Sequence, residues 1–209
     1  MATIAKIALV GWLGPKKASD YRKLVNLVRD HDAEVRLRAV ERIGFNGSRE
    51  TTDLLLAALD DPDELVRVQG LEELSYRKDL TDADAERIRP CLDDESKLVR
   101  RYAATALAAA RDLSAIPLLK ERLDRAATAE QSSYCFALVE LGEREYLDTA
   151  LGLLEAECYQ TRCSVANRIV DFVDDSNREW IVAALRKAWQ TEASRAVRTT
   201  IERVQKEIG

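Results

Sequence analysis

The chain repeats one short pattern of residues three times, and this self-similarity constrains its fold more than any other feature. The copies span residues 28–43, 59–74 and 92–107, so that they begin 31 and 33 residues apart. In each copy an aspartate precedes a Val-Arg pair by four intervening residues, and a small residue and an aliphatic residue follow the Val at +4 and +8. Repeats of this length are typical of stacked supersecondary units. The aspartates and pairs are Asp30, Asp61 and Asp94, and Val35-Arg36, Val66-Arg67 and Val99-Arg100.

The offsets within each copy predict an α-helix with one buried face. Positions 0, +4 and +8 lie on the same side of a helix. The aspartate before them is expected to cap the free backbone N–H groups at the helix start. Between the copies lie other segments with apolar residues at three- and four-residue steps. Each unit is therefore predicted to be a first helix and a second helix, and the fold class to be all-α, an α-solenoid of about five to six stacked hairpins.

Three later copies of the pattern are weaker. The fourth, in residues 132–142, has Ser133-Tyr134 in place of Val-Arg, and the fifth, in residues 161–172, also loses the pair. The sixth keeps Val197-Arg198 with an imperfect continuation. We place the small and aliphatic positions of the fourth and fifth copies at Ala137 and Leu141, and at Ala166 and Val170.

The repeated Asp, Val-Arg, Ala and Leu positions resemble those of HEAT repeats, in the shorter variety that includes the phycobilin-lyase-like proteins. The resemblance covers residues 20–175 well and the remainder loosely. It implies helix pairs stacked into a right-handed solenoid with second helices along the concave side, and it specifies a fold, not an activity. We expect one domain over residues 1–209, with a capping helix in 1–19, repeats in 20–175 and a capping hairpin in 176–209.

The arginine of each Val-Arg pair lies beside the buried face of its helix. In a stack of hairpins its guanidinium can reach the aspartate of its own or a neighbouring unit. We expect a ladder of structural ion pairs, not ligand contacts. The ladder residues are Asp30, Arg36, Asp61, Arg67, Asp94 and Arg100.

A second stripe of residues is expected to face away from the core, on the concave side. The residue three positions after the Val changes from polar to aromatic along successive units, and Glu72 and Tyr134 flank these positions. Aromatic residues are favoured anchors at interfaces. The alternative is that the register slips after the third copy and Phe136 belongs to the core. The predicted partner-binding residues are Arg38, Gln69, Glu72, Tyr102, Tyr134 and Phe136.

The net charge of the chain indicates which class of partner it could bind. The net charge is −5; residues 177–209 hold 7 basic and 4 acidic residues, so the first 176 residues carry a net −8. An acidic body argues against nucleic acid as a partner, because phosphate backbones require clustered Lys and Arg. It favours a protein with a basic surface.

Residues for catalysis or metal binding are few. His31 is the only histidine and stands in an acidic turn, while Cys158 and Cys163 have no nearby histidine for zinc. We predict no catalytic residues, no metal and no cofactor. No apolar run approaches the ~20 residues of a membrane span, and the start of the chain is predicted to be a capping helix, not a signal peptide. The four cysteines are expected to be free thiols in the cytoplasm, in a protein that is most simply a monomer.

These features favour a non-catalytic binding protein that acts as a scaffold, adaptor or inhibitor, for example a bacterial immunity protein that neutralises a basic toxin. The resemblance to phycobilin-lyase-like proteins implies an alternative, a bilin lyase or chaperone. A DNA glycosylase built on similar helical repeats ranks last, because it needs a basic groove.

Overall fold

The computed structural model of the protein describes residues 2–14 and 17–208, most of which are helical. Within these residues there are α-helices and short 3₁₀ segments and no strand, which confirms the all-α prediction. The expected spans also include residues 1, 15–16 and 209, which lie outside the described part. The chain divides into two compact units, residues 1–115 and 116–209.

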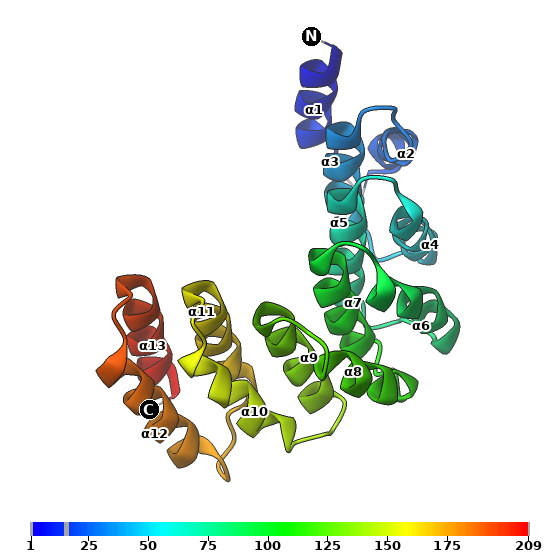
Figure 1. Cartoon of the computed structure of the whole chain (residues 1–209). Helices are drawn as coiled ribbons and strands as arrows, with labels where there is room; N and C mark the ends of the chain where they lie inside the picture. The colour runs from blue at the N-terminus through cyan, green and yellow to red at the C-terminus, as the bar shows by residue number, and fades with distance from the viewer. Residues whose placement is uncertain (1, 15–16, 209) are drawn as a thin grey trace. The chain divides into compact units, whose positions relative to one another are not determined.

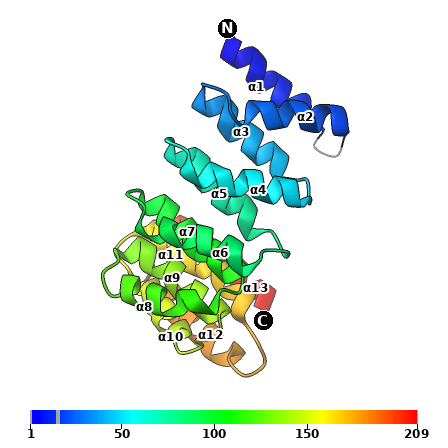
Figure 2. The same cartoon turned by 90° about the vertical axis from the view of Figure 1, so that its right-hand side faces the viewer.

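Unit 1 is a stack of helical hairpins. Figures 1 and 2 show the second helices α3, α5 and α7 in a row, with the first helices α2, α4 and α6 beside them. The helix α1 packs on α3 and begins the row. The 3₁₀ segments Ala58–Asp60 and Arg89–Asp93 extend α4 and α6. The bounds are α1 Ala2–Trp12, α2 Ala18–Leu27, α3 Ala33–Gly44, α4 Arg49–Ala57, α5 Glu64–Ser75, α6 Asp82–Ile88 and α7 Lys97–Ala109.

Unit 2 continues the same alternation of first and second helices. In Figure 1 the second helices α9, α11 and α13 lie side by side, and α9 also packs on α8 and α10. The bounds are α8 Ile116–Leu123, α9 Thr128–Glu140, α10 Tyr146–Gly152, α11 Tyr159–Arg168, α12 Arg178–Thr191 and α13 Arg195–Ile208.

The repeated apolar positions form the core of unit 1. Val35, Val66 and Val99 are almost completely buried, as are the aliphatic residues eight positions later. The small residue between them permits close helix packing, as Gly70 shows. A Cβ atom at Gly70 would lie 3.1 Å from the carbonyl oxygen of Leu55, so that a larger side chain would push α5 away from α4.

The repeated aspartates do not cap the second helices, and this part of the prediction was wrong by two residues. The N-caps of α3 and α5 are Asp32 and Asp63, whose carboxylates accept backbone N–H groups of the first turn. Asp30 and Asp61 instead accept the N–H groups of Asp32 and Asp63, at 3.1 and 2.9 Å. Asp94 accepts the N–H of the residue two positions later in the same way. The repeated aspartate thus shapes the turn while its carboxylate also accepts from a basic side chain of the preceding element, Lys6 at Asp30, Arg36 at Asp61 and Arg67 at Asp94.

Candidate interaction surface

An arginine ladder joins consecutive hairpins of unit 1. Arg36 donates from Nε and Nη2 to both carboxylate oxygens of Asp61, at 2.7 Å each. Arg67 makes the same paired contact with Asp94, at 2.9 Å each. The remaining nitrogen, Nη1, donates to backbone carbonyls of the arginine's own turn, for example from Arg67 to Asp61 at 2.9 Å. Each guanidinium therefore connects the turn of one hairpin to that of the next.

The first aspartate and the third arginine of this ladder make further contacts. Asp30 accepts a hydrogen bond from the ammonium of Lys6 on α1, at 2.5 Å. At the other end of unit 1, Arg100 donates from Nη1 to the carbonyl oxygens of Asp94 and Glu95, at 2.7 and 3.1 Å. The turn contact of the arginine is thus the same in all three copies.

Unit 2 contains one further rung, which corrects the register of the fifth copy. Arg162 donates from Nε and Nη2 to Glu192, at 2.6 and 2.9 Å, and from Nη1 to two carbonyls of its own turn. The fifth copy was expected to lack the arginine, but Arg162 is its ladder arginine, one position before the place that Ala166 and Val170 would give it. The buried residues that follow it at the repeat offsets are Val165 and Ile169, where Ala166 and Val170 had been expected. Glu192 precedes Val197 by the same offset as Asp61 precedes Val66. This offset could have identified Glu192 from the sequence as the carboxylate of the last repeat.

The ladder is electrostatically satisfied. Burial raises the pKa of Asp61. The hydrogen bonds from Arg36 and from the backbone N–H of Asp63 lower it by more than burial raises it, so the pKa of Asp61 lies below its ordinary value. The hydrogen bonds to Asp61 and Asp94 raise the pKa values of Arg36 and Arg67. Both arginines are largely buried, at 12% and 9% side-chain exposure. These groups hold the repeats together and have little capacity left for a ligand.

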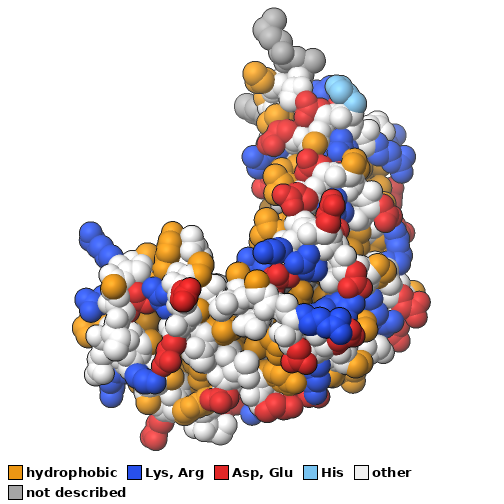
Figure 3. All heavy atoms as spheres, viewed as in Figure 1, with side chains coloured by type: hydrophobic (Ala, Val, Ile, Leu, Met, Phe, Trp, Pro, Cys, Tyr) orange, Lys and Arg blue, Asp and Glu red, His pale blue; other side chains and the backbone are white. Residues whose placement is uncertain are grey.

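The solvent-facing side of α5 and α7 carries exposed apolar residues. Leu65 on α5 and Leu98 on α7 are 47% and 39% exposed, and Tyr76 at the end of α5 is 72% exposed. In this region of unit 1, Figure 3 shows hydrophobic side chains interspersed with acidic and basic ones. We call this surface the second-helix face. It comprises Leu65, Gln69, Glu72 and Tyr76, which lie at i, i+4, i+7 and i+11 along α5, and Leu98 and Tyr102, which lie at i and i+4 on α7.

Tyr102 lies where α5 and α7 meet on this face. Its side chain is partly buried, and its pKa is raised first by that burial and then by the charge of Glu72. Gln69 donates to Glu73 at 2.9 Å and is held along its helix. The structure thus brings Gln69, Glu72 and Tyr102 together with the exposed apolar residues of the second-helix face.

Arg38 belongs to the corresponding side of α3 but is engaged locally. It is 48% exposed and pairs with Glu34 and Glu41 of its own helix, at 2.9 and 3.2 Å. These contacts neutralise that part of α3, and the apolar residues of the surface lie on α5 and α7.

Tyr134 and Phe136 do not belong to an exposed stripe, and this prediction was wrong. They are 1% and 0% exposed. Phe136 stacks on Phe172, with ring centroids 5.1 Å apart, and the guanidinium of Arg168 lies 4.9 Å from its ring. The helix α9 packs against α8, α10 and α11 and is buried on nearly every side. The absence of charged residues from positions 131–139 could have predicted this burial, because a helix without a charged face is usually a buried helix.

The described residues contain no cluster of three or more His, Cys, Asp or Glu that could hold a metal ion. None of the helices in the described ranges has the length and hydrophobicity needed to cross a membrane.

The four cysteines are unpaired and differ in environment. Burial raises the pKa of Cys91 to about 11 and that of Cys135 to about 12. Cys158 is exposed at the start of α11, where backbone N–H groups of Thr161 and Gln160 lower its pKa. Because the thiolate is the reactive form, we expect iodoacetamide at neutral pH to modify Cys158 well before Cys91 and Cys135. Peptide mapping of a labelling time course measures this, with Cys158→Ser as the control that should lose the fast phase; fast modification of Cys135 would contradict it.

Glu73 is a half-buried carboxyl between α3 and α5, and it occupies the space that a side chain at Gly44 would need. Burial raises its pKa to about 7; nearby Glu72 and Glu41 add to the shift, and the hydrogen bond from Gln69 opposes it. A pKa that is higher in the folded state gives stability that is complete below the unfolded value, 4.5, and is lost as the pH rises through about 7.

We therefore expect Glu73→Gln to raise the free energy of unfolding at pH 8 by about 1–2 kcal/mol and to change it little at pH 4. Urea denaturation at the two pH values measures the difference. Glu157→Gln, at an exposed glutamate of unit 2, is the matched control and should change the free energy of unfolding little at either pH. A Glu73→Gln effect that is the same at both pH values would contradict this account.

Comparison with known proteins agrees with the repeats seen in the structure. Residues 21–86 match the family model of HEAT repeats, and residues 99–125 match that of the PBS lyase HEAT-like repeat. The chain contains HEAT repeats. The matched segments include the first three copies of the Val-Arg pair, all of α5 and residues 99–109 of α7.

Solved structures extend the likeness in fold. The complex of CpcE and CpcF of phycocyanin lyase from Nostoc sp. PCC7120 contains a chain that matches with a TM-score of 0.69 and 16% identity, over 99% of this chain and 90% of that one. An engineered protein matches with a TM-score of 0.52 and 17% identity, over 90% and 96% of the two chains. No curated protein sequence matches this HEAT-repeat chain. At these identities the likeness concerns the fold alone.

Proposed function

We propose that this chain is a non-catalytic protein-interaction module that binds a partner with a basic surface through the second-helix face. The observation that carries the proposal is the exposure of Leu65, Tyr76 and Leu98 on neighbouring HEAT helices. Exposed aromatic and aliphatic side chains on one surface are the usual anchors of a protein interface.

The arginine ladder supports a binding role because it holds the helices that carry these anchors. Arg67 on α5 is bound to the turn that precedes α7 through Asp94. A rigid surface loses less conformational entropy on binding than a flexible one. Repeat scaffolds commonly present such surfaces to other proteins.

Charge supports a basic partner. The first 176 residues carry a net −8, and Glu72 lies among the apolar residues of the second-helix face. Complementary charge accelerates association and disfavours acidic competitors. An inhibitor fits this chemistry, and an immunity protein that neutralises a basic toxin is the specific form we propose. The unpaired cysteines support a reducing, cytoplasmic setting.

The non-catalytic part of the proposal rests on the only histidine. His31 lies in an exposed turn, with Nδ1 3.0 Å from the Asp30 carboxylate, in contact with a residue of the structural ladder. A general base is expected in a cleft beside a nucleophile.

Affinity purification from the source cell tests the proposal. The full chain should retain a stoichiometric partner. The affinity of the variant Leu65→Ser/Tyr76→Ser/Leu98→Ser for this partner should be at least ten-fold lower, a loss of about 1.4 kcal/mol or more in binding free energy. The control variant Leu113→Ser/Tyr159→Ser changes exposed apolar residues on other elements and should retain the partner. Thermal unfolding establishes that both variants fold. Equal capture by the triple variant and the wild type would overturn the proposed surface.

The alternative function, bilin binding, is suggested by the fold that this chain shares with a chain of a phycocyanin lyase complex. Absorbance spectroscopy tests it directly. We expect no change in visible absorbance when the protein is mixed with a linear tetrapyrrole. A saturable spectral change with one pigment per chain would favour bilin binding over the function proposed here.

A further inference from the structure

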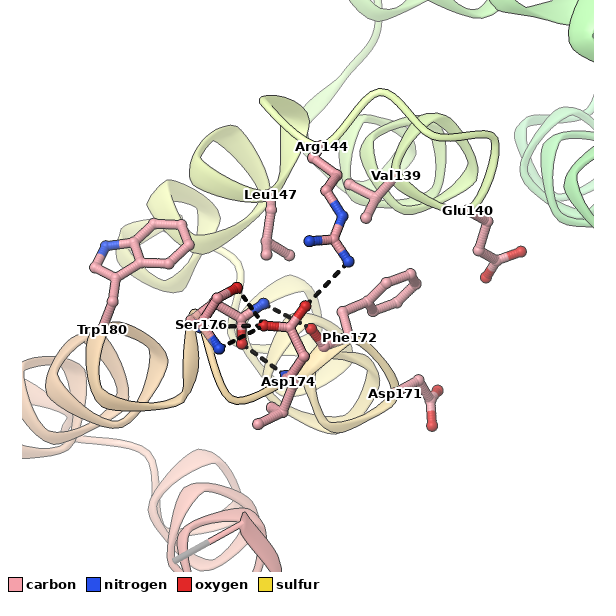
Figure 4. Close-up of a pocket in the computed structure, with 11 residues that line it drawn as sticks. Val139, Glu140, Arg144, Leu147, Asp171, Phe172, Asp174, Ser176 and Trp180 are labelled. Atoms are coloured by element: carbon pink, nitrogen blue, oxygen red, sulfur yellow. Dashed lines mark hydrogen bonds and ion pairs between the residues drawn. The ribbon is translucent and has the colours of Figure 1, made fainter.

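Unit 2 contains a cavity of about 380 Å³ between the end of α9, the helix α10 and the start of α12 (Figure 4). Val139, Leu147 and Phe172 provide apolar surface. Trp180, which is 42% exposed, stands at one side. A cavity of this size is at the small end of ligand sites, so it suits a single side chain better than a large cofactor.

Charged residues surround this apolar surface, and most of them are acidic. Arg144 donates to Asp174 at 3.0 Å across the cavity. Asp174 also accepts the backbone N–H groups of Ser176 and Asn177, so it is committed to its own turn. In Figure 4 the carboxylates of Glu140 and Asp171 lie on the far side of Phe172 from Trp180.

Glu140 and Asp171 form a negative end of the cavity. Burial raises the pKa of Glu140, Arg168 opposes that shift, and the charge of Asp171 adds to it. Arg168 bonds Oε1 of Glu140 at 2.8 Å. Among the described residues, no Lys or Arg pairs with Asp171. Arg168 already compensates the charge of Glu140, so Asp171 is the carboxylate at this end with which a bound cation would pair.

We propose that this cavity receives an arginine side chain from the surface of a partner protein. The guanidinium lies at Asp171 and Glu140, and the methylene stem lies along Phe172 and Leu147. This inference rests on the proposed function in that it requires a protein partner, but it concerns a different surface from the second-helix face.

Two features of unit 2 favour arginine over lysine. The cavity already holds one guanidinium, that of Arg144 at Asp174, and Arg168 combines a carboxylate contact with a position over the Phe136 ring. A planar guanidinium can pair with carboxylates and lie on an aromatic face at the same time, whereas an ammonium is a compact charge.

Titration of the full chain with N-acetylarginine amide, followed by NMR, tests the inference. The indole N–H resonance of Trp180, assigned with Trp180→Phe, and the methyl resonances of Leu147 should shift and saturate at millimolar probe. N-acetylcitrulline amide, which has the same shape without the charge, should bind at least ten-fold more weakly. Asp171→Asn should weaken binding of the arginine probe by a similar factor, and Glu157→Gln, an exposed residue of unit 2 outside the cavity, should leave it unchanged.

Equal binding of the citrulline probe, full binding by Asp171→Asn, or no saturable shift of the cavity resonances would each overturn the arginine site. The Leu65→Ser/Tyr76→Ser/Leu98→Ser variant separates this inference from the proposed function. It should bind the arginine probe normally even where it no longer captures a partner. A chain that binds the probe but captures no partner would reject the proposed function and with it the partner's arginine, and would keep only the affinity of the cavity for a guanidinium.

Discussion

Replacement of Arg67 by methionine is expected to lower the free energy of unfolding by about 3–5 kcal/mol. The change would remove both hydrogen bonds to Asp94, whose side chain is only 14% exposed, and would leave that carboxylate without its bidentate partner. The carbonyl oxygens of Asp61 and Pro62 would lose their donor as well. Methionine keeps most of the apolar stem, so the loss reports on the charge and the hydrogen bonds. Urea denaturation measures it.

Arg38→Met is the matched control for this experiment. Arg38 is also paired with carboxylates, but it is 48% exposed and its partners, Glu34 and Glu41, lie on its own helix. Pairs of this kind contribute less than about 1 kcal/mol. If the two substitutions cost the same, the ladder does not join the hairpins in the way described.

Phe136→Ala is expected to destabilise the protein by about 3–5 kcal/mol, as large-to-small changes in a packed core do. The ring is fully buried, stacks on Phe172 and lies under the guanidinium of Arg168. The substitution would leave a cavity and would remove both contacts. Chemical denaturation of the variant measures the loss.

Tyr102→Ala separates a core residue from a surface residue. Tyr102 is only partly buried on the second-helix face, so its removal should cost clearly less stability than that of Phe136 while weakening capture of the partner. Folded Phe136→Ala protein, measured below its own melting temperature, should capture the partner normally. A folded Phe136→Ala variant that loses the partner while Tyr102→Ala retains it would indicate that Phe136 belongs to the interface and not to the core.

The hairpins and the ladder were predictable because fixed offsets determine which residues share a helix face. Val66, Gly70 and Leu74 are four residues apart and therefore had to lie on one side of α5. Arg67, next to that buried face, was within reach of a neighbouring turn. The periodicity repeats the same local geometry, so three copies predict one another.

Other features depend on contacts that no local pattern specifies. Asp30 and Asp32 are both suited to capping, and only the three-dimensional turn distinguishes the cap from the ladder residue. The burial of Phe136 depends on the helices around α9. The cavity of unit 2 combines Glu140 with the distant Asp171 and Trp180, which share no repeat position.

Site-specific photo-crosslinking tests directly whether the second-helix face binds a protein partner. A benzophenone side chain would replace Tyr76 or Tyr102 in the full chain, with Leu113, which is 64% exposed on another element, as the control position. We expect one crosslinked partner from Tyr76 and Tyr102 in the source cell and none from Leu113. Adducts that form equally from all three positions, or from Leu113 alone, would contradict it.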